Sequence, residues 1–140
     1  MEGILQRIHH LGYVVPSIEP IVKLYGDLWK ARLGFHNIIE HRGLEIAWFY
    51  VGNNIVEFIR PLNNNCQETE FLRSHGPSLH HVAFLGEDIE RALDVLEMKK
   101  LPKSELHIRL SDVGNWRVLT LPKELTSGII TQLVDFRRGM

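Results

Sequence analysis

The sequence predicts an α+β fold in which two repeated βαβββ modules form a curled mixed sheet around a central metal cleft. The main observation is a doubled His-His pair, in Ile8-His9-His10-Leu11 and again in Leu79-His80-His81-Val82. His10 and His81 are 71 residues apart (81 minus 10), and the same offset aligns further stretches of the chain. A self-match at a fixed period indicates a repeated structural unit.

The repeat has matched segments at its beginning and at its end. At offset 71, Ser17-Ile18-Glu19 aligns with Asp88-Ile89-Glu90. Later the offset becomes 75, which places Ile55–Ile59 over Ile130–Val134. A difference of four residues between the two offsets (75 minus 71) is easily accommodated in a loop.

The first module begins with a strand over residues 4–15, which Pro16 ends. Ser17 is a typical N-cap, and apolar residues at helical spacing predict a helix that Gly34 terminates. A tight hairpin turn is expected at Gly52-Asn53-Asn54. The three remaining strands of the module are predicted at 35–42, 44–51 and 55–60.

The second module repeats this order after a polar linker that holds a short helix near 68–73. Its first strand covers 78–85, and Asp88 caps a helix that runs to about Lys100. Three further strands are predicted at 106–110, 116–121 and 128–136. We therefore expect a single domain with modules at about 4–62 and 78–136 and the linker at 63–77.

Composition restricts the class of protein. Hydrophobic residues make up 44% of the chain and charged residues 24%, which is typical of a globular protein. The net charge of −1 predicts neither a nucleic-acid partner nor an anionic membrane partner. Cys66 is the single cysteine, so the chain has no internal disulfide. Without a signal peptide or an apolar run long enough to cross a bilayer, we expect a cytoplasmic protein.

The two modules supply four candidate metal ligands at equivalent positions. His10 and His81 come from the first strands, and Glu57 and Gln132 from the last strands. Each residue alone is more typical of a core or solvent-facing position, but their coincidence in the repeat predicts one site. Two imidazoles, a carboxylate and an amide oxygen suit a divalent ion such as Co, Mn, Ni, Zn, Fe or Mg.

The other histidine of each pair, His9 or His80, points to the opposite face, because successive side chains on a strand alternate. We interpret His9 and His80 as structural. The remaining histidines have no matched partner in the repeat and are assigned no role.

The chain resembles the vicinal oxygen chelate superfamily of glyoxalases, extradiol dioxygenases and bleomycin-resistance proteins over nearly all of its length. The stretches that carry the resemblance are Ile8–Gly12, Val56–Leu62, Ser78–Phe84 with Glu87-Asp88-Ile89, and Leu121-Pro122-Lys123 through Ile130. Within the superfamily, the double-His strand, the Pro-Leu ending and the Pro-Lys turn are most similar to methylmalonyl-CoA epimerases.

The resemblance implies a metal-dependent isomerase or epimerase that acts on a small-molecule substrate, an acyl-CoA, and pairs as a homodimer. In epimerase-like members the metal would hold a thioester enolate, while carboxylates on opposite sides remove and return the α-proton. Glu45 matches one of these base positions, and burial would have to raise its carboxyl pKa for that role. From the residues alone, Glu45 is equally well an exposed strand residue near a turn.

One position departs from the family pattern. The last ligand is normally a Glu that also looks like the second base, whereas this chain has Gln132. An amide oxygen can bind a metal but cannot take a proton. Glu57 stands where epimerases often carry Gln, so the charge of the ligand set is unchanged. Asp135 lies three residues further on with the wrong strand parity to replace the missing carboxylate.

This departure leaves several functions open. Two-base epimerisation lacks its second carboxylate, whereas a one-base proton transfer or a different reaction on an enolisable substrate stays open. One alternative is a non-catalytic binding protein of the same fold, of the kind that confers resistance by holding an antibiotic or metabolite. A glyoxalase I-like lyase is another alternative.

Overall fold

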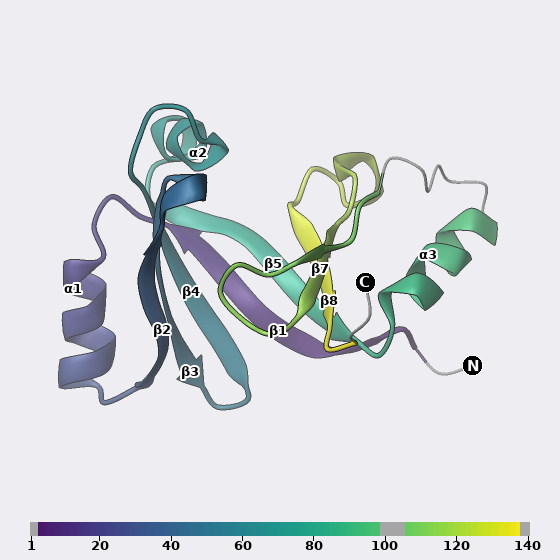
Figure 1. Ribbon diagram of the computed structural model, residues 1–140, viewed down its shortest axis with the longest axis horizontal. Helices are drawn as coiled ribbons and strands as arrows, with labels where there is room; N and C mark the ends of the chain where they lie inside the picture. Colours follow the sequence, from purple (N-terminus) through teal and green to yellow (C-terminus); the bar gives the residue numbers. More distant parts are fainter. Residues whose placement is uncertain (1–2, 99–105, 138–140) are drawn as a thin grey trace. The chain divides into compact units, whose positions relative to one another are not determined.

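The first half of the chain has the predicted order of one strand, a helical segment and three strands (Figure 1). The computed structural model describes residues 3–98 and 106–137. The helical segment is continuous and consists of α1 (Glu19–Ile21) and the π-helix η1 (Val22–Leu28). The strands are β1 (Leu5–Val14), β2 (Arg32–Ile39), β3 (Leu44–Val51) and β4 (Asn54–Pro61), with a 3-10 turn η2 (Glu40–Arg42) before β3.

The second half repeats this order after the linker helix α2 (Gln67–His75). Its elements are β5 (Ser78–Gly86), α3 (Ile89–Met98), β6 (Arg109–Leu110), β7 (Arg117–Thr120), the 3-10 turn η3 (Lys123–Leu125) and β8 (Thr131–Asp135). The strand predicted at 106–110 is therefore shorter than expected. The predicted helix end near Lys100 lies outside the described residues.

The strand order is β2-β3-β4-β1-β5-β8-β7-β6. β1 pairs with β4 and β5 with β8 in parallel, whereas β2–β3, β3–β4, β6–β7 and β7–β8 are antiparallel. The predicted α+β class with a mixed sheet is thus confirmed. None of the described helices is long and apolar enough to cross a membrane.

The compact units differ from the modules that the repeat predicts. The first unit holds His10–His80, and the second holds the described residues before His10 and after His80. Each His-His pair therefore lies where a strand, β1 or β5, passes from one unit into the other. The start of the chain belongs to the second unit, where Ile4 packs beside the α3 core and its carbonyl oxygen approaches Gly86.

The first helix differs from the prediction at both ends. Ser17 is not the N-cap; Ile18 occupies that position, and no side chain caps the helix. The helical segment ends before Lys30, whose positive φ of 59° reverses the chain direction. Gly34 is therefore not a C-cap but lies inside β2 at a register shift, where the ring of Trp48 packs against it.

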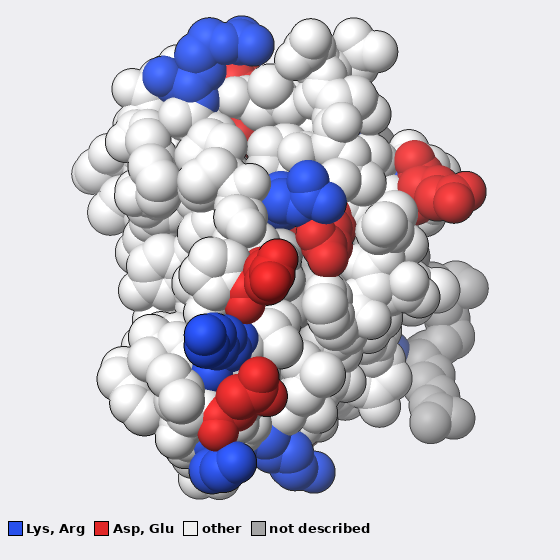
Figure 2. Space-filling view, turned by 90° about the vertical axis from the view of Figure 1, so that its left-hand side faces the viewer, with Lys and Arg blue, Asp and Glu red and all other residues white. Residues whose placement is uncertain are grey.

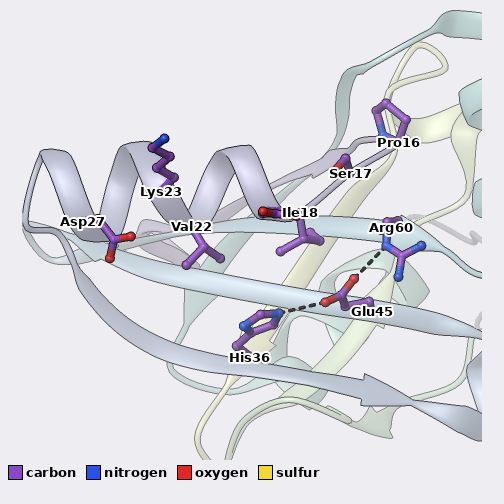
Figure 3. Close-up of a pocket in the computed structure, with 10 residues that line it drawn as sticks. Pro16, Ser17, Ile18, Val22, Lys23, Asp27, His36, Glu45 and Arg60 are labelled. Atoms are coloured by element: carbon purple, nitrogen blue, oxygen red, sulfur yellow. Dashed lines mark hydrogen bonds and ion pairs between the residues drawn. The ribbon is translucent and has the colours of Figure 1, made fainter.

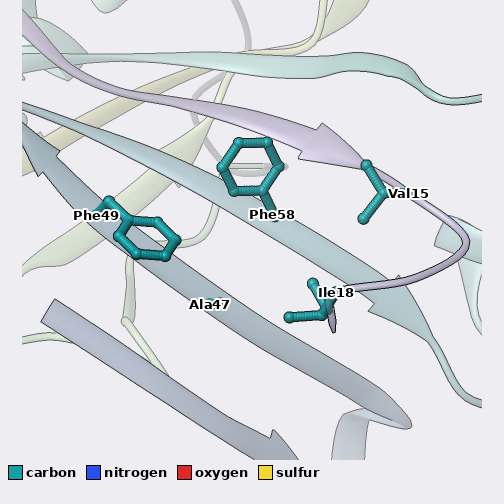
Figure 4. Close-up of a cluster of buried hydrophobic side chains, with 5 residues drawn as sticks. All are labelled: Val15, Ile18, Ala47, Phe49 and Phe58. Carbon is teal, nitrogen blue, oxygen red and sulfur yellow. The ribbon is translucent and has the colours of Figure 1, made fainter. Parts of the chain in front are cut away.

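The helical segment of the first unit covers one face of its strands. Five buried side chains form this core, Val15, Ile18, Ala47, Phe49 and Phe58 (Figure 4). The ring of Tyr25 lies 5.6 Å from that of Phe49 and 5.1 Å from that of Phe58. The odd-numbered side chains of β3 therefore face the helix.

α3 covers the corresponding face of the second unit, where Ile89, Ala92 and Leu93 pack on Leu119 and Leu133. The helix begins as predicted, because the Asp88 carboxylate accepts the Glu90 backbone N–H at 2.9 Å.

A buried ion-pair network joins α3 to β7 and β8. The fully buried Asp135 carboxylate accepts hydrogen bonds from the Ile89 backbone N–H at 2.8 Å and from Arg117 at 2.8 and 2.6 Å. Arg117 also donates to both carboxylate oxygens of Glu90, at 2.6 Å each. The Arg117 guanidinium lowers the pKa of Glu90 to about 2. Burial alone would raise the pKa of Asp135, but the bonds from Arg117 and Ile89 hold it below its usual value.

Gly34 tests the contact between β2 and Trp48. A Cβ at this position would lie 1.7 Å from the Trp48 ring, so we expect Gly34→Ala to lower the free energy of unfolding by about 1–3 kcal/mol. Gly26→Ala is the matched control, because its Cβ would meet the Phe49 ring at an ordinary 3.5 Å. Urea denaturation measures both changes. Equal stability of Gly34→Ala and the wild type would contradict this packing.

The Arg117 network predicts a characteristic loss of stability in acid. Because the folded-state pKa values of Glu90 and Asp135 lie below their unfolded values of 4.5 and 3.8, the network stabilises the protein above about pH 5. This stabilisation is lost as the pH falls toward 2. At pH 7, Arg117→Met should cost roughly 3–5 kcal/mol, because it leaves Asp135 buried without its partner.

Urea denaturation between pH 2 and pH 7 measures this effect. Glu90→Gln is the control and should cost much less, because the Glu90 side chain is 52% exposed. Equal losses for the two variants would show that the buried Asp135 pair does not dominate the network.

Candidate metal centre

The first unit places His10 and Glu57 on one face of two neighbouring strands. β1 and β4 run parallel, with His10 opposite Ile55 and Gly12 opposite Glu57. Residues opposite each other share a face, and so do residues two apart on one strand, so the His10 and Glu57 side chains point the same way. Both are buried, at 3% and 6% exposure.

The second unit repeats this arrangement with His81 and Gln132. β5 and β8 run parallel, and Ala83 lies opposite Gln132. His81, two residues before Ala83, therefore shares the face of Gln132. Both side chains are buried, at 5% and 8% exposure. On the next strand, Thr120 lies opposite Gln132 and adds a hydroxyl to the same face.

The chemistry of these side chains fits a divalent metal ion. Each unit contributes buried side chains of the kinds that bind such an ion, His10 and Glu57 in the first and His81 and Gln132 in the second. A carboxylate and imidazoles are costly to bury unless they are paired, hydrogen-bonded or bound to a metal. The amide oxygen of Gln132 adds a neutral ligand, and thiolates, which favour structural zinc sites, are absent from the set.

Among the described residues, a second group of side chains that could bind a metal consists of carboxylates alone, and it does not resemble a metal site. It consists of Asp88, Glu90 and Asp135, and its charge is already balanced by cations. Arg117 bridges Glu90 and Asp135, and Arg137 pairs with Asp88 at 2.8 Å.

His9 and His80 face away from the candidate ligands and have aromatic neighbours, as a packing role requires. The His9 ring is 2% exposed and makes edge contacts with Trp116 and Phe136, at centroid distances of 4.6 and 5.7 Å. The His80 ring meets Phe71 edge-on at 4.7 Å.

The role of Glu45 as a base stays a prediction, but the strand register places its side chain away from the face of Glu57. Trp48 lies opposite Glu57 across β3 and β4, whereas Glu45 lies opposite Arg60. Because Glu45 is three residues from Trp48, its side chain points to the other face of the sheet, toward the helical segment (Figure 3).

The contacts of Glu45 also oppose the pKa that a general base requires. One carboxylate oxygen accepts a hydrogen bond from Arg60 Nε at 2.7 Å, and the other bonds His36 Nε2 at 2.8 Å. Burial raises the pKa of Glu45, but the bonds from His36 and Arg60 outweigh it and hold the pKa below its usual value. Glu45 is therefore an ionised carboxylate that fixes Arg60.

Asp135 is likewise no substitute for the missing final carboxylate, as its strand parity predicts. It lies opposite Arg117, on the helix-covered face with Leu133, while Gln132 faces the other way. Sequence reasoning did not identify the Arg117 and Arg60 ion pairs. The signal was present, since the offset of 75 aligns Arg60 with Asp135.

The sequence is similar to those of several known proteins. The uncharacterized protein YqjC of Bacillus subtilis is 25% identical over 131 residues, covering 94% of this chain and 93% of that protein. The mitochondrial methylmalonyl-CoA epimerase of Mus musculus is 24% identical over 130 residues, covering 92% of this chain and 72% of that protein.

Solved structures show the same fold. The methylmalonyl-CoA epimerase of Mycobacterium tuberculosis superimposes with a TM-score of 0.81 at 17% identity, covering 99% of this chain and 93% of that one. A methylmalonyl-CoA epimerase in complex with methylmalonyl-CoA superimposes with a TM-score of 0.76 at 20% identity, covering 94% of each chain. The family profile of the Glyoxalase/Bleomycin resistance protein/Dioxygenase superfamily matches residues 9–119, and the chain belongs to this superfamily.

Proposed function

We propose that the chain is a metal-dependent, epimerase-like enzyme that transfers a proton at the α-carbon of an acyl-CoA. The ligands of its divalent ion are His10, Glu57, His81 and Gln132. The observation that carries the proposal is the repeated strand pair: β1–β4 and β5–β8 each present a buried imidazole and a buried oxygen ligand on one face. The relatives named methylmalonyl-CoA epimerase support the substrate class.

A bound divalent cation supplies Lewis-acid stabilisation of the negative charge that develops on a carbonyl oxygen when an α-proton leaves. Co, Mn, Ni, Zn, Fe and Mg all suit the donor set. His10 and His81 bind through ring nitrogens, while Glu57 and Gln132 bind through oxygens. Burial of all four side chains keeps bulk water from competing for these positions.

The residues of this chain favour a one-base proton transfer over a two-base epimerisation. The Gln132 amide cannot accept a proton, and Glu45 lies on the opposite face of the sheet. Among the four ligands, only Glu57 has a carboxylate oxygen that can take up the α-proton. Proton exchange with solvent should therefore be faster than inversion of configuration.

A second candidate function is non-catalytic binding of a small molecule. The absence of a carboxylate at Gln132 and the low pKa of Glu45 favour this alternative. It predicts ligand binding without turnover. A cytoplasmic location and a homodimer stay predictions for either function.

Solvent deuterium exchange separates the two functions. The metal-loaded protein, incubated in deuterium oxide with methylmalonyl-CoA and related acyl-CoAs, should incorporate deuterium at the α-carbon, as mass spectrometry measures. Removal of the metal with a chelator should slow exchange roughly a hundredfold or more, because the charge on the carbonyl oxygen loses its stabilisation. Metal added back should restore the rate.

Two variants sharpen this experiment. His81→Ala should lose exchange as the chelated protein does, because a ligand is missing. Glu45→Gln is the matched control and should keep the wild-type rate, because Glu45 faces away from the ligands. If the metal-loaded wild type exchanges no deuterium on any acyl-CoA tested, the binding function is favoured. If Glu45→Gln loses deuterium exchange, Glu45 takes part in the proton transfer.

A further inference from the structure

A second candidate site lies on the helix-covered face of the first unit. Here a groove of about 550 Å³ runs between the helical segment and the strands (Figure 3). The lining residues that matter are Ile18, Val22, Asp27, His36, Glu45 and Arg60. The strand register places this groove on the face opposite to His10 and Glu57, so it is separate from the proposed metal ligands.

Arg60 presents unused hydrogen-bond donors at one end of the groove. Its Nε donates to Glu45 at 2.7 Å, and its two terminal amino groups have no partner within residues 3–98 and 106–137. The guanidinium is partly exposed, and the outer edge of an arginine matches a carboxylate with two parallel hydrogen bonds.

The second unit shows what such an arginine binds in this fold. The Glu45–Arg60 pair on β3 and β4 corresponds to the Arg117–Asp135 pair on β7 and β8. The carboxylate is on the earlier strand in the first pair, whereas the guanidinium is on the earlier strand in the second. Arg117 binds Asp135 and also the carboxylate of Glu90. Glu19 aligns with Glu90 in the repeat but makes no ion pair with Arg60. Among the described residues of the first unit, therefore, no carboxylate binds Arg60 in the way that Glu90 binds Arg117.

The far end of the groove has the opposite charge. The Asp27 carboxylate points toward the strands (Figure 3) and has no ion pair within the described part of the chain. Asp27 follows Ile18 by nine positions along the helical segment. Ile18 and Val22 lie between the two ends and face the strands (Figure 3). Acidic and basic side chains are interspersed over the surface that carries this helical segment (Figure 2).

We propose that this groove binds a small zwitterion whose carboxylate and ammonium groups are separated by an extended apolar body, as in an ω-amino acid. The carboxylate binds the terminal amino groups of Arg60, the ammonium binds Asp27, and the body lies on Ile18 and Val22. Glu45 holds Arg60 in place from the sheet side, and His36 in turn bonds Glu45. The volume lies within the range of small-molecule sites.

Titration of the wild-type protein with 6-aminohexanoate, hexanoate and hexylamine tests this proposal without any mutation. Amide NMR spectra should show saturable shifts at Val22, Asp27 and Arg60 with 6-aminohexanoate. Hexanoate and hexylamine, which each lack one charged end, should bind at least tenfold more weakly, because one charge-assisted contact is lost. Equal affinity for hexanoate, or no saturable shift with 6-aminohexanoate, would overturn the proposal.

Three variants locate the two ends. Arg60→Gln and Asp27→Asn should each weaken 6-aminohexanoate binding at least tenfold. Lys123→Gln is the matched control, because Lys123 lies on η3 in the second unit and does not line this groove; the affinity of this variant should stay within twofold of the wild type. Thermal denaturation checks that the variants fold. Unchanged binding in Asp27→Asn would overturn the assignment of the ammonium end.

Discussion

The parallel pairings of β1 with β4 and of β5 with β8 decide on which face every site residue lies. Side chains alternate along a strand, so a register shift of one residue would move each ligand to the helix-covered face. The observed registers bring His10 together with Glu57 and His81 together with Gln132. The same alternation directs His9 and His80 away, so a neighbouring histidine is available for packing without competing for the metal.

The opposite faces are organised by ion pairs between the last two strands of each half. In the second unit the buried Arg117 neutralises both the buried Asp135 and the half-exposed Glu90. In the first unit the exchanged charges leave Arg60 with free donors beside a groove. The two halves therefore share a backbone plan, while the exchange of the acidic and the basic side chain between the paired strands makes one face a closed network and the other an open site.

The repeat made most of the fold predictable from the sequence, because the first strand, the start of the helix and the last strand recur in both halves. The β3 boundaries and the Asp88 cap were predicted correctly. The first helix was not, because Lys30 takes a positive φ and Gly34 belongs to a bulge, which depends on the packing of Trp48. The face on which Glu45 lies could not be predicted, because local sequence does not show the pairing of β3 with β4, whereas the face of Asp135 followed from its parity to Gln132.

We infer that ligands from both halves of the chain bind one divalent ion. Plasma mass spectrometry of the protein reconstituted with cobalt and then desalted tests it most directly. We expect one ion per chain in the wild type and almost none in either His10→Ala or His81→Ala, because each variant removes a ligand of the same site. Two ions per chain, an ion retained by either variant, or no ion in the reconstituted wild type would contradict the account.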